Sequence, residues 1–420
     1  MAYYNIFPEI DATIYSLPYR LHLNTGRDEI IEVVKEKGTS DPKHYPSRIL
    51  IRFSNEDITE AIQNTLGSTS FNTKSTCSLQ LTTTEHKNLT QILNLQAYAI
   101  SQSWQEGSGR YSNLPTGSDG VSWLNRNGSI YENKWVHPGA GIGFSAVTDS
   151  SASSDGFVIG TYLEDASGAP AYMTPGTTGS ISSSGGEFKI THGGGMWYTG
   201  SGFEATQQFL FGSELDTDID VTDIVKKWSG SLFASNTYPD GIENYGFIIK
   251  QPDSVEANTT ASFGEMQYFS VETKTIYPPK LVFKWDDSTH NKQSSAKQSG
   301  ELNVSLYRNK EEYNQNDIAM FRVHVRDKYP TRTFSTTSNY LNVGYFTTSS
   351  FYSIRDAYTE EEVIPFDTSN TKMSADDDGM YFKVYMKGLQ PERYYRLLFK
   401  HKNNEGTTIY DNDYYFKVVR

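Results

Sequence analysis

The clearest periodic pattern in the chain follows residue 220. Apolar side chains recur there at the i, i+3, i+4 and i+7 spacing of one helix face, namely Val221, Ile224, Val225 and Trp228. Asp220 is placed to cap this helix, and Lys226 and Lys227 are expected in its last turn, where positive charge suits the helix dipole. A helix of two turns does not persist alone, so the pattern predicts that it packs on a larger element.

Strand-like runs surround this helix in the sequence. They predict strands at residues 11–15, 24–34 (after a turn), 47–53, 93–99, 245–249 and 281–285. A second helical spacing, at residues 57–66, predicts a short helix. The pattern therefore predicts that residues 1–287 form one β-sandwich, built by segments from both sides of the first helix.

Residues 140–202 interrupt this domain with a stretch rich in Gly, Ser and Thr. The stretch is longer than an ordinary loop and too poor in apolar residues to nucleate a core. Short strand patterns at residues 156–160 and 187–190 predict an ordered insertion at the edge of the sandwich. Insertions of this kind tend to carry partner contacts.

A polar stretch at residues 288–300 predicts a linker, and strand patterns resume beyond it. Strand candidates follow at residues 303–307, 318–325, 379–386, 394–401 and 414–419. Residues 301–420 have about the size of an immunoglobulin-like sandwich. A Leu389-x-Pro391 turn ahead of Tyr394 and Tyr395 resembles the corner before a late strand of fibronectin type III and immunoglobulin-like domains, where the turn precedes a buried tyrosine.

Several short motifs resemble those of DNRLRE-type jelly-roll domains. They are Asp11-Ala12, Asn24-x-Gly26, the Arg, Leu and Phe of residues 47–53, Trp104-x-Glu106-Gly107, Gly120-x-x-Trp123, the Tyr-Phe-Ser-x-Glu of residues 268–272 and Pro279-x-Leu281-x-Phe283. The resemblance implies a jelly-roll-like sandwich of a family found in carbohydrate-binding modules, surface proteins and phage particles. The expected fold is thus all-β: a jelly-roll-like sandwich with a Gly/Ser-rich insertion, followed by an immunoglobulin-like sandwich.

The composition of the chain argues against several classes of function. The aromatic residues, led by 29 Tyr and 22 Phe, suit sheets. A net charge of −13 argues against nucleic acid as a partner. With Cys77 as its single cysteine the chain forms no internal disulfide and no cysteine-based zinc site. No signal peptide or membrane-spanning run of about 20 apolar residues is visible, so we expect synthesis in the host cytoplasm and no membrane partner.

Candidate binding residues lie on the loops after residue 100. Trp104, Tyr111 and Trp123 have flat rings that stack on sugars when they are exposed. The alternative is that Trp104, Trp123 and Trp135 fill the core or brace the loops, as large aromatic side chains usually do.

Patterns of catalysis and metal binding are weak in this chain. No serine elbow, phosphate loop or His-Glu-x-x-His pair is found, and His192 with the glycines after it is interpreted as a turn. The acids of residues 216–223 resemble part of a calcium loop, but Val221 and Lys227 stand where that loop needs Gly and an acid. We therefore predict no catalytic residues, no metal site and no cofactor, and interpret these acids as solvated groups that cap the helix.

Two functions remain at this point. The stretch at residues 388–400 and the closing Tyr414–Arg420 segment resemble virion structural proteins of T4-like marine cyanophages. That resemblance implies a non-enzymatic structural protein of a tailed-phage virion, at the neck, tail or baseplate periphery, that contacts other virion proteins and copies of itself in a symmetric assembly. The alternative is a carbohydrate-binding or adhesive surface module that contacts host polysaccharide; a polysaccharide-cleaving enzyme is a less favoured third.

Overall fold

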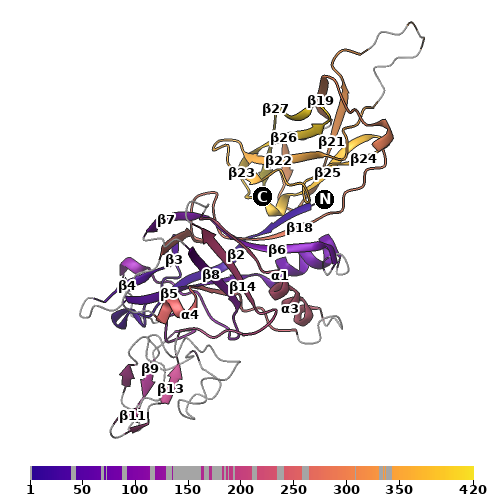
Figure 1. Ribbon diagram of the computed structural model, residues 1–420. Helices are drawn as coiled ribbons and strands as arrows, with labels where there is room; N and C mark the ends of the chain where they lie inside the picture. The colour runs from indigo at the N-terminus through magenta and orange to yellow at the C-terminus, as the bar shows by residue number, and fades with distance from the viewer. Residues whose placement is uncertain are drawn as a thin grey trace. The chain divides into compact units, whose positions relative to one another are not determined.

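The computed structural model describes residues 2–420 apart from 39–43, 68–70, 72, 88–91, 114–118, 129–134, 136–161, 165–169, 173–181, 184–185, 188, 193, 211–214, 234–240, 258–263, 308, 331–333, 335 and 337–342. The described chain consists mainly of strands in several largely antiparallel sheets with a few short helices, which confirms the predicted all-β fold (Figure 1). It forms two compact units. The sandwich unit holds Phe7–Thr65 and Cys77–Leu281, and the immunoglobulin-like unit holds Met1–Ile6, Leu66–Thr76 and Val282–Arg420.

The sandwich unit is built around one central sheet. Its strands follow the order β14 (Glu204–Leu210), β8 (Ile92–Ala99), β16 (Phe247–Lys250), β5 (His44–Phe53) and β2 (Pro8–Tyr15), and β4 (Lys35–Lys37) also pairs with β5. A second sheet joins β3 (Ile30–Val33), β17 (Glu265–Phe269) and β7 (Thr83–Lys87), and β15 (Thr217–Asp220) pairs with β6 (Ser75–Leu81). The central sheet combines strands from both sides of the helix that follows residue 220, as the alternation predicts.

Both faces of the central sheet are covered, which explains why β5 is buried along most of its length. Side chains of a strand alternate between the two faces. One face contributes Ala12, Ile14, Leu50, Tyr98 and Ile248 to a core that also contains four tryptophans. Phe247 and Phe53 belong to the opposite face, where their rings lie 6.2 Å apart.

Helix α3 (Thr222–Leu232) packs on that opposite face. All four side chains of its predicted apolar stripe are buried, and the Trp228 ring lies 4.6 Å from the Phe247 ring. Asp220 Oδ1 accepts hydrogen bonds from the amide and hydroxyl of Thr222, the first residue of the helix. The N-cap position itself is Val221, so the predicted cap lies one residue before it. The predicted end of the helix is wrong, because α3 continues to Leu232 and places Lys226 and Lys227 in its middle. Burial of Gly230 against Gly241 overrides the weak helix propensity of the last turn.

Further helices and turns of the sandwich unit are short. The predicted helix at residues 57–66 is present as α1 (Asn55–Thr59), which Ser54 caps, followed by the π-helix η2 (Glu60–Leu66). The others are η1 (Pro18–Arg20), η3 (Tyr111–Asn113) and α4 (Asp253–Ala257). In the insertion, β9 (Tyr162–Glu164) pairs with β10 (Pro170–Tyr172) and β13 (Lys189–His192), and β11 (Ser182–Ser183) pairs with β12 (Gly186–Glu187). The predicted strand at 187–190 falls on β12 and β13, and the one at 156–160 lies outside the described residues.

The immunoglobulin-like unit is a sandwich of two sheets. One sheet has the order β19 (Leu302–Tyr307), β21 (Ile318–Asp327), β25 (Gly379–Tyr385) and β24 (Ser374–Asp376). The other has the order β20 (Glu312–Asn314), β27 (Gly406–Val419), β26 (Arg393–Asn403), β22 (Ser350–Asp356) and β23 (Glu362–Ile364). These orders correspond to the ABED and GFC sheets of immunoglobulin domains. Strand β1 (Ala2–Ile6) pairs with β18 (Lys280–Trp285), and the side chain of Asn5 donates to Gly388 at the end of η7 (Met386–Gly388).

Two further expectations concern this unit. The tyrosine predicted to be buried after the Leu-x-Pro turn is Tyr395, whose hydroxyl donates to the carbonyl of Gln390 at 2.8 Å. Residues 288–300, which include η5 (Gln293–Ser295), run along the edge of this sandwich. The carbonyl of Thr289 accepts from Ala375 of β24, and the amide of Lys297 donates to Tyr345.

Candidate functional site

Three of the loop motifs meet around the side chain of Asn24 in the sandwich unit. Its Nδ2 donates to the carbonyls of Glu106 at 2.6 Å and Val121 at 2.8 Å. Its Oδ1 accepts from the amide of Gly109 at 2.7 Å. A single buried amide therefore fixes the loop at residues 103–111 and the segment at residues 119–125 against the turn after β2.

Glycines allow this close approach. The backbones of Gly107 and Gly120 have φ values of +86° and +78°, a region that side chains rarely adopt. A Cβ on Gly120 would lie 2.4 Å from the Cα of Gly107, and one on Gly26 would lie 2.3 Å from the carbonyl oxygen of Glu106. The glycines of the three motifs are thus required by packing at this junction.

The tryptophans of these loops point inward. Trp104, Trp123 and Trp135 are at most 1% exposed. Trp104 Nε1 donates to the carbonyl of Tyr245 at 2.8 Å, and Trp135 Nε1 donates to that of Ser122 at 3.0 Å. Because these side chains are buried, no indole face is open to a sugar. Trp104 and Trp123 therefore brace the loops, as the alternative interpretation predicts, and do not stack on a ligand. Of the three predicted binding residues, Tyr111 lines the pocket that is described below.

The ends of the segment between Trp135 and Gly194 attach at one place. The amide of Trp135 donates to the carbonyl of Leu124 at 3.1 Å, and the amide of Gly194 donates to that of Trp123 at 2.8 Å. Both ends are therefore held by adjacent residues of one loop.

A buried charge cluster, formed by Arg48, Lys250 and Glu256, lies beneath these loops. The Glu256 carboxylate is 2.6 Å from Arg48 Nη2 and 3.3 Å from Lys250 Nζ, and all three side chains are fully buried. The Arg48 guanidinium lies 4.7 Å from the Trp123 ring and 5.1 Å from the Trp197 ring, and it donates to the carbonyl of Gly194. This cluster joins β5, β16 and α4 to the returning end of the insertion.

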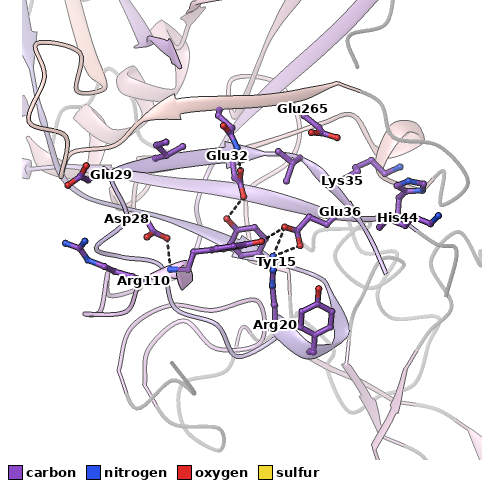
Figure 2. Close-up of a pocket in the computed structure, with 16 residues that line it drawn as sticks. Tyr15, Arg20, Asp28, Glu29, Glu32, Lys35, Glu36, His44, Arg110 and Glu265 are labelled. Carbon is purple, nitrogen blue, oxygen red and sulfur yellow. Dashed lines mark hydrogen bonds and ion pairs between the residues drawn. The ribbon is translucent and has the colours of Figure 1, made fainter. Parts of the chain in front are cut away.

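A cavity of about 850 Å³ opens beside β2 (Figure 2). It is lined by Tyr15, Tyr19, Arg20, Asp28, Glu29, Ile30, Glu32, Val34, Lys35, Glu36, Lys37, His44, Arg110, Tyr111, Glu265 and Gln267. These residues come mainly from the end of β2, η1, β3, β4, β17 and the loop that Asn24 fixes. Because Asn24 fixes the loop at residues 103–111, it also positions Tyr111 in the wall of this pocket.

One wall of the pocket is a fixed ion pair between Arg20 and Glu36. The two carboxylate oxygens lie 2.5 and 2.6 Å from Arg20 Nη1, and the Tyr111 hydroxyl donates to the same carboxylate at 2.7 Å. The guanidinium also lies 4.0 Å from the centre of the Tyr111 ring. Burial, followed by this hydrogen bond, raises the pKa of Tyr111, so its hydroxyl stays protonated and remains a donor.

The floor of the pocket is organised by Glu32. Its carboxylate accepts from the Tyr15 hydroxyl at 2.6 Å and from Gln267 Nε2 at 2.8 Å (Figure 2). Burial raises the pKa of Glu32, although both hydrogen bonds act in the opposite direction. Burial also raises the pKa of Tyr15, with the Glu32 charge as the next cause.

Two further charged side chains line the pocket, Asp28 and the buried Lys35. The amide of Tyr111 donates to Asp28 Oδ2 at 2.9 Å, and burial raises the pKa of that carboxyl. Burial lowers the pKa of Lys35 to about 8, while Glu256 opposes the shift. The pocket therefore presents hydrogen-bond donors and acceptors side by side.

Sequence reasoning missed most of this pocket. Tyr111 was identified, but Tyr15, Arg20, Glu32 and Glu36 were not. A signal was available in the charged residues of the predicted strand near residue 32, which interrupt an otherwise apolar run. The ion pair with Arg20 has no signal of its own, because its spacing of 16 residues matches no local periodicity.

The acids near α3 have separate partners. Asp216 Oδ1 accepts from the amide of Thr83, Asp218 accepts from the Gln80 side chain, and Asp220 accepts from the amide of Thr222. Within the described part of the chain, no group of three or more His, Cys, Asp or Glu side chains is arranged to hold a metal ion. Among the described helices, none is long and apolar enough to cross a membrane.

Comparison with known proteins adds no relative. No protein-family model matches the chain, and no curated protein matches it. The resemblance to DNRLRE-type domains and to cyanophage virion proteins therefore stays a prediction that depends on the motifs themselves.

Proposed function

We propose that this chain is a non-enzymatic structural protein of a tailed-phage particle that acts through protein-protein contacts at the neck, tail or baseplate periphery. The supporting observation is a pair of exposed apolar side chains on one face of the immunoglobulin-like unit. Ile318 and Met320 of β21 are 60% and 48% exposed. Exposed apolar side chains that lie together on a soluble protein commonly mark a contact site.

The geometry of β21 explains how this face arises. Ala319 and Phe321 point into the core, so Ile318 and Met320 point outward from the same sheet. Met320 lies opposite Lys383 in the ladder with β25. The exposed apolar pair has charged neighbours on its sheet, an arrangement that suits a contact with another protein subunit.

The proposal is tested first on particles. Mass spectrometry of purified virions of the encoding phage is expected to detect this chain at the level of a structural subunit. Its absence from intact particles, while it is present in infected-cell extract, would end the proposal.

A variant pair then tests the apolar face. The double variant Ile318→Asp, Met320→Asp is expected to fold but to be missing from purified particles when it replaces the wild-type chain. Tyr358→Asp is the matched control, because Tyr358 is 83% exposed in a turn of the same unit. Equal incorporation of the double variant and the control would remove this face from the assembly contact.

A further inference from the structure

The cavity beside β2 has features of a built binding site. Its volume of about 850 Å³ falls in the range of small-molecule sites, roughly 300–1,000 Å³. Its wall and floor are held by hydrogen bonds of 2.5–2.8 Å, from Arg20 and Tyr111 to Glu36 and from Tyr15 and Gln267 to Glu32. Polar groups fixed in this way are ordered before a ligand arrives, which reduces the entropy lost on binding.

The charges that line the cavity nearly balance. Five carboxylates line it (Asp28, Glu29, Glu32, Glu36 and Glu265), together with four cations (Arg20, Lys35, Lys37 and Arg110) and His44. A phosphate or sulfate ligand would require an excess of positive charge, and a polyamine would require an excess of negative charge. The lining therefore favours an uncharged ligand.

The hydrogen-bonding groups narrow the ligand further. Carboxylates accept hydrogen bonds, Arg and Lys donate them, and a hydroxyl group does both. The arrangement of Glu36 beside Arg20, and of Glu32 beside Gln267, places an acceptor next to a donor at two points of the cavity. A molecule with adjacent hydroxyl groups matches this alternation, whereas an apolar molecule would find mainly Ile30 and Val34 and the tyrosine rings.

A flat surface stands at the rim of the cavity. Tyr19 is 56% exposed, and the Arg20 guanidinium lies 5.3 Å from the centre of its ring. An aromatic ring held by a cation and open to solvent can pack against the C–H face of a pyranose. Tyr19 thus complements the polar groups deeper in the pocket.

We propose that this cavity binds a neutral saccharide, with Tyr19 stacked on one sugar ring and the Arg20–Glu36 pair bonded to its hydroxyl groups. This site differs from the loop tryptophans considered from the sequence, and it does not depend on a role in the phage particle. A particle protein and a protein that has no place in a particle can both carry it.

The test uses the purified full chain. Maltoheptaose, cellohexaose and mannohexaose are the neutral probes, and an alginate hexamer and a chitosan hexamer are the charged ones; binding is screened by saturation-transfer NMR and measured by calorimetry. At least one neutral probe is expected to bind more tightly than both charged probes. Tyr19→Ala and Glu36→Gln are each expected to weaken that binding about tenfold or more. Tyr19→Ala is expected to keep the wild-type melting temperature within about 2 °C, because Tyr19 is exposed, whereas Glu36→Gln loses the pair with Arg20 and is expected to melt a few degrees lower while it still folds.

Two exposed residues supply the controls. Tyr358→Ala and Glu301→Gln remove a solvent-exposed tyrosine and a solvent-exposed carboxylate of the immunoglobulin-like unit, neither of which lines the cavity, and both are expected to bind as the wild type does. The proposal is overturned if none of the neutral probes binds, if a charged probe binds more tightly, or if Tyr19→Ala binds as the controls do.

Discussion

The interiors of the two units contain different kinds of contact. The sandwich unit places Arg48, Lys250 and Glu256 in its interior, and joins residues that are 208 positions apart in the sequence. The immunoglobulin-like unit instead stacks aromatic rings, with Tyr352 4.2 Å and Phe321 5.3 Å from Phe382. Removal of one partner from the first unit's cluster would therefore leave a buried charge, whereas the second unit's aromatic contacts are apolar and are already specified by strand alternation.

The strongest test of this contrast is Glu256→Ala. The change leaves Arg48 buried without its carboxylate and leaves Lys250 with Asp253 alone, which we expect to lower the free energy of unfolding of the sandwich unit by about 3–5 kcal/mol. Five of the six tryptophans belong to this unit, so urea unfolding followed by tryptophan fluorescence reports mainly on it. Glu85→Ala is the control: it breaks the exposed pair with Lys87 and should cost about 0–1 kcal/mol. Equal losses in the two variants would contradict a structural role for the buried cluster.

Gly120→Ala tests the junction around Asn24. The new Cβ would meet the Cα of Gly107 in addition to the strain of a positive φ, and we expect a loss of about 3 kcal/mol in the same unfolding experiment. Gly200→Ala separates the two causes, because Gly200 also has a positive φ but no atom within 4 Å of the added Cβ. It should cost about 1–2 kcal/mol. If the two variants lose the same amount, close approach at the junction is not what requires glycine.

In the immunoglobulin-like unit a single polar change should matter less. Tyr395→Phe removes the hydrogen bond to the Gln390 carbonyl, and we expect a loss of about 1 kcal/mol. The neighbouring Tyr394→Phe should be nearly neutral, since Tyr394 is 44% exposed. Hydrogen exchange of peptides from β26, measured by mass spectrometry, reports on this unit. Faster exchange in Tyr394→Phe than in Tyr395→Phe would refute the corner interaction.

The smallest expected effect is a pH dependence of opposite sign in the two units. Burial lowers the pKa of His401, which is stacked on Phe346, from 6.5 to about 4. The unfolded chain then takes up the proton first, so the immunoglobulin-like unit loses stability as the pH falls from 6.5 to about 4. Burial raises the pKa of Glu106 from 4.5 to about 6 despite the Arg27 charge, so this carboxyl makes the sandwich unit less stable as the pH rises through that range.

Variants isolate these two slopes. Relative to His401→Phe, the wild type should lose stability as the pH falls, measured by hydrogen exchange of β26. Relative to Glu106→Gln, the wild type should lose stability as the pH rises, measured by tryptophan-detected unfolding. Each slope should be at most about 1.4 kcal/mol per pH unit, the value for one proton. Slopes of the same sign in both units would contradict the assignment.

The contrast also explains how much the sequence could predict. The apolar stripe of α3, most strands and the buried tyrosine of the corner follow from periodicity and turn chemistry, which are local properties. Burial of Trp104 and Trp123 does not follow from them, because each indole is equally compatible with a loop surface and a core. Burial of Trp104 depends on a hydrogen-bond partner, the carbonyl of Tyr245, which is close in space but 141 residues away in the sequence.

The pocket is even harder to predict from local sequence patterns. Arg20 meets Glu36, and Tyr15 meets Glu32, across a turn and two strands whose register is set by the whole sheet. Strand β1 shows the same limit in the other unit: five residues have no periodicity long enough to indicate their partner, and they pair with β18, which begins at Lys280. Contacts between distant segments are thus the part of this fold that only coordinates reveal.

The attachment of Trp135 and Gly194 to adjacent carbonyls of one loop has an engineering consequence. A segment that departs and returns through neighbouring anchor points is a natural cassette, because the scaffold needs only a short bridge between them. Exchange of residues 136–193 for a brief Gly/Ser bridge should leave the rest of the sandwich unit intact, and the same anchor points could then host a foreign peptide.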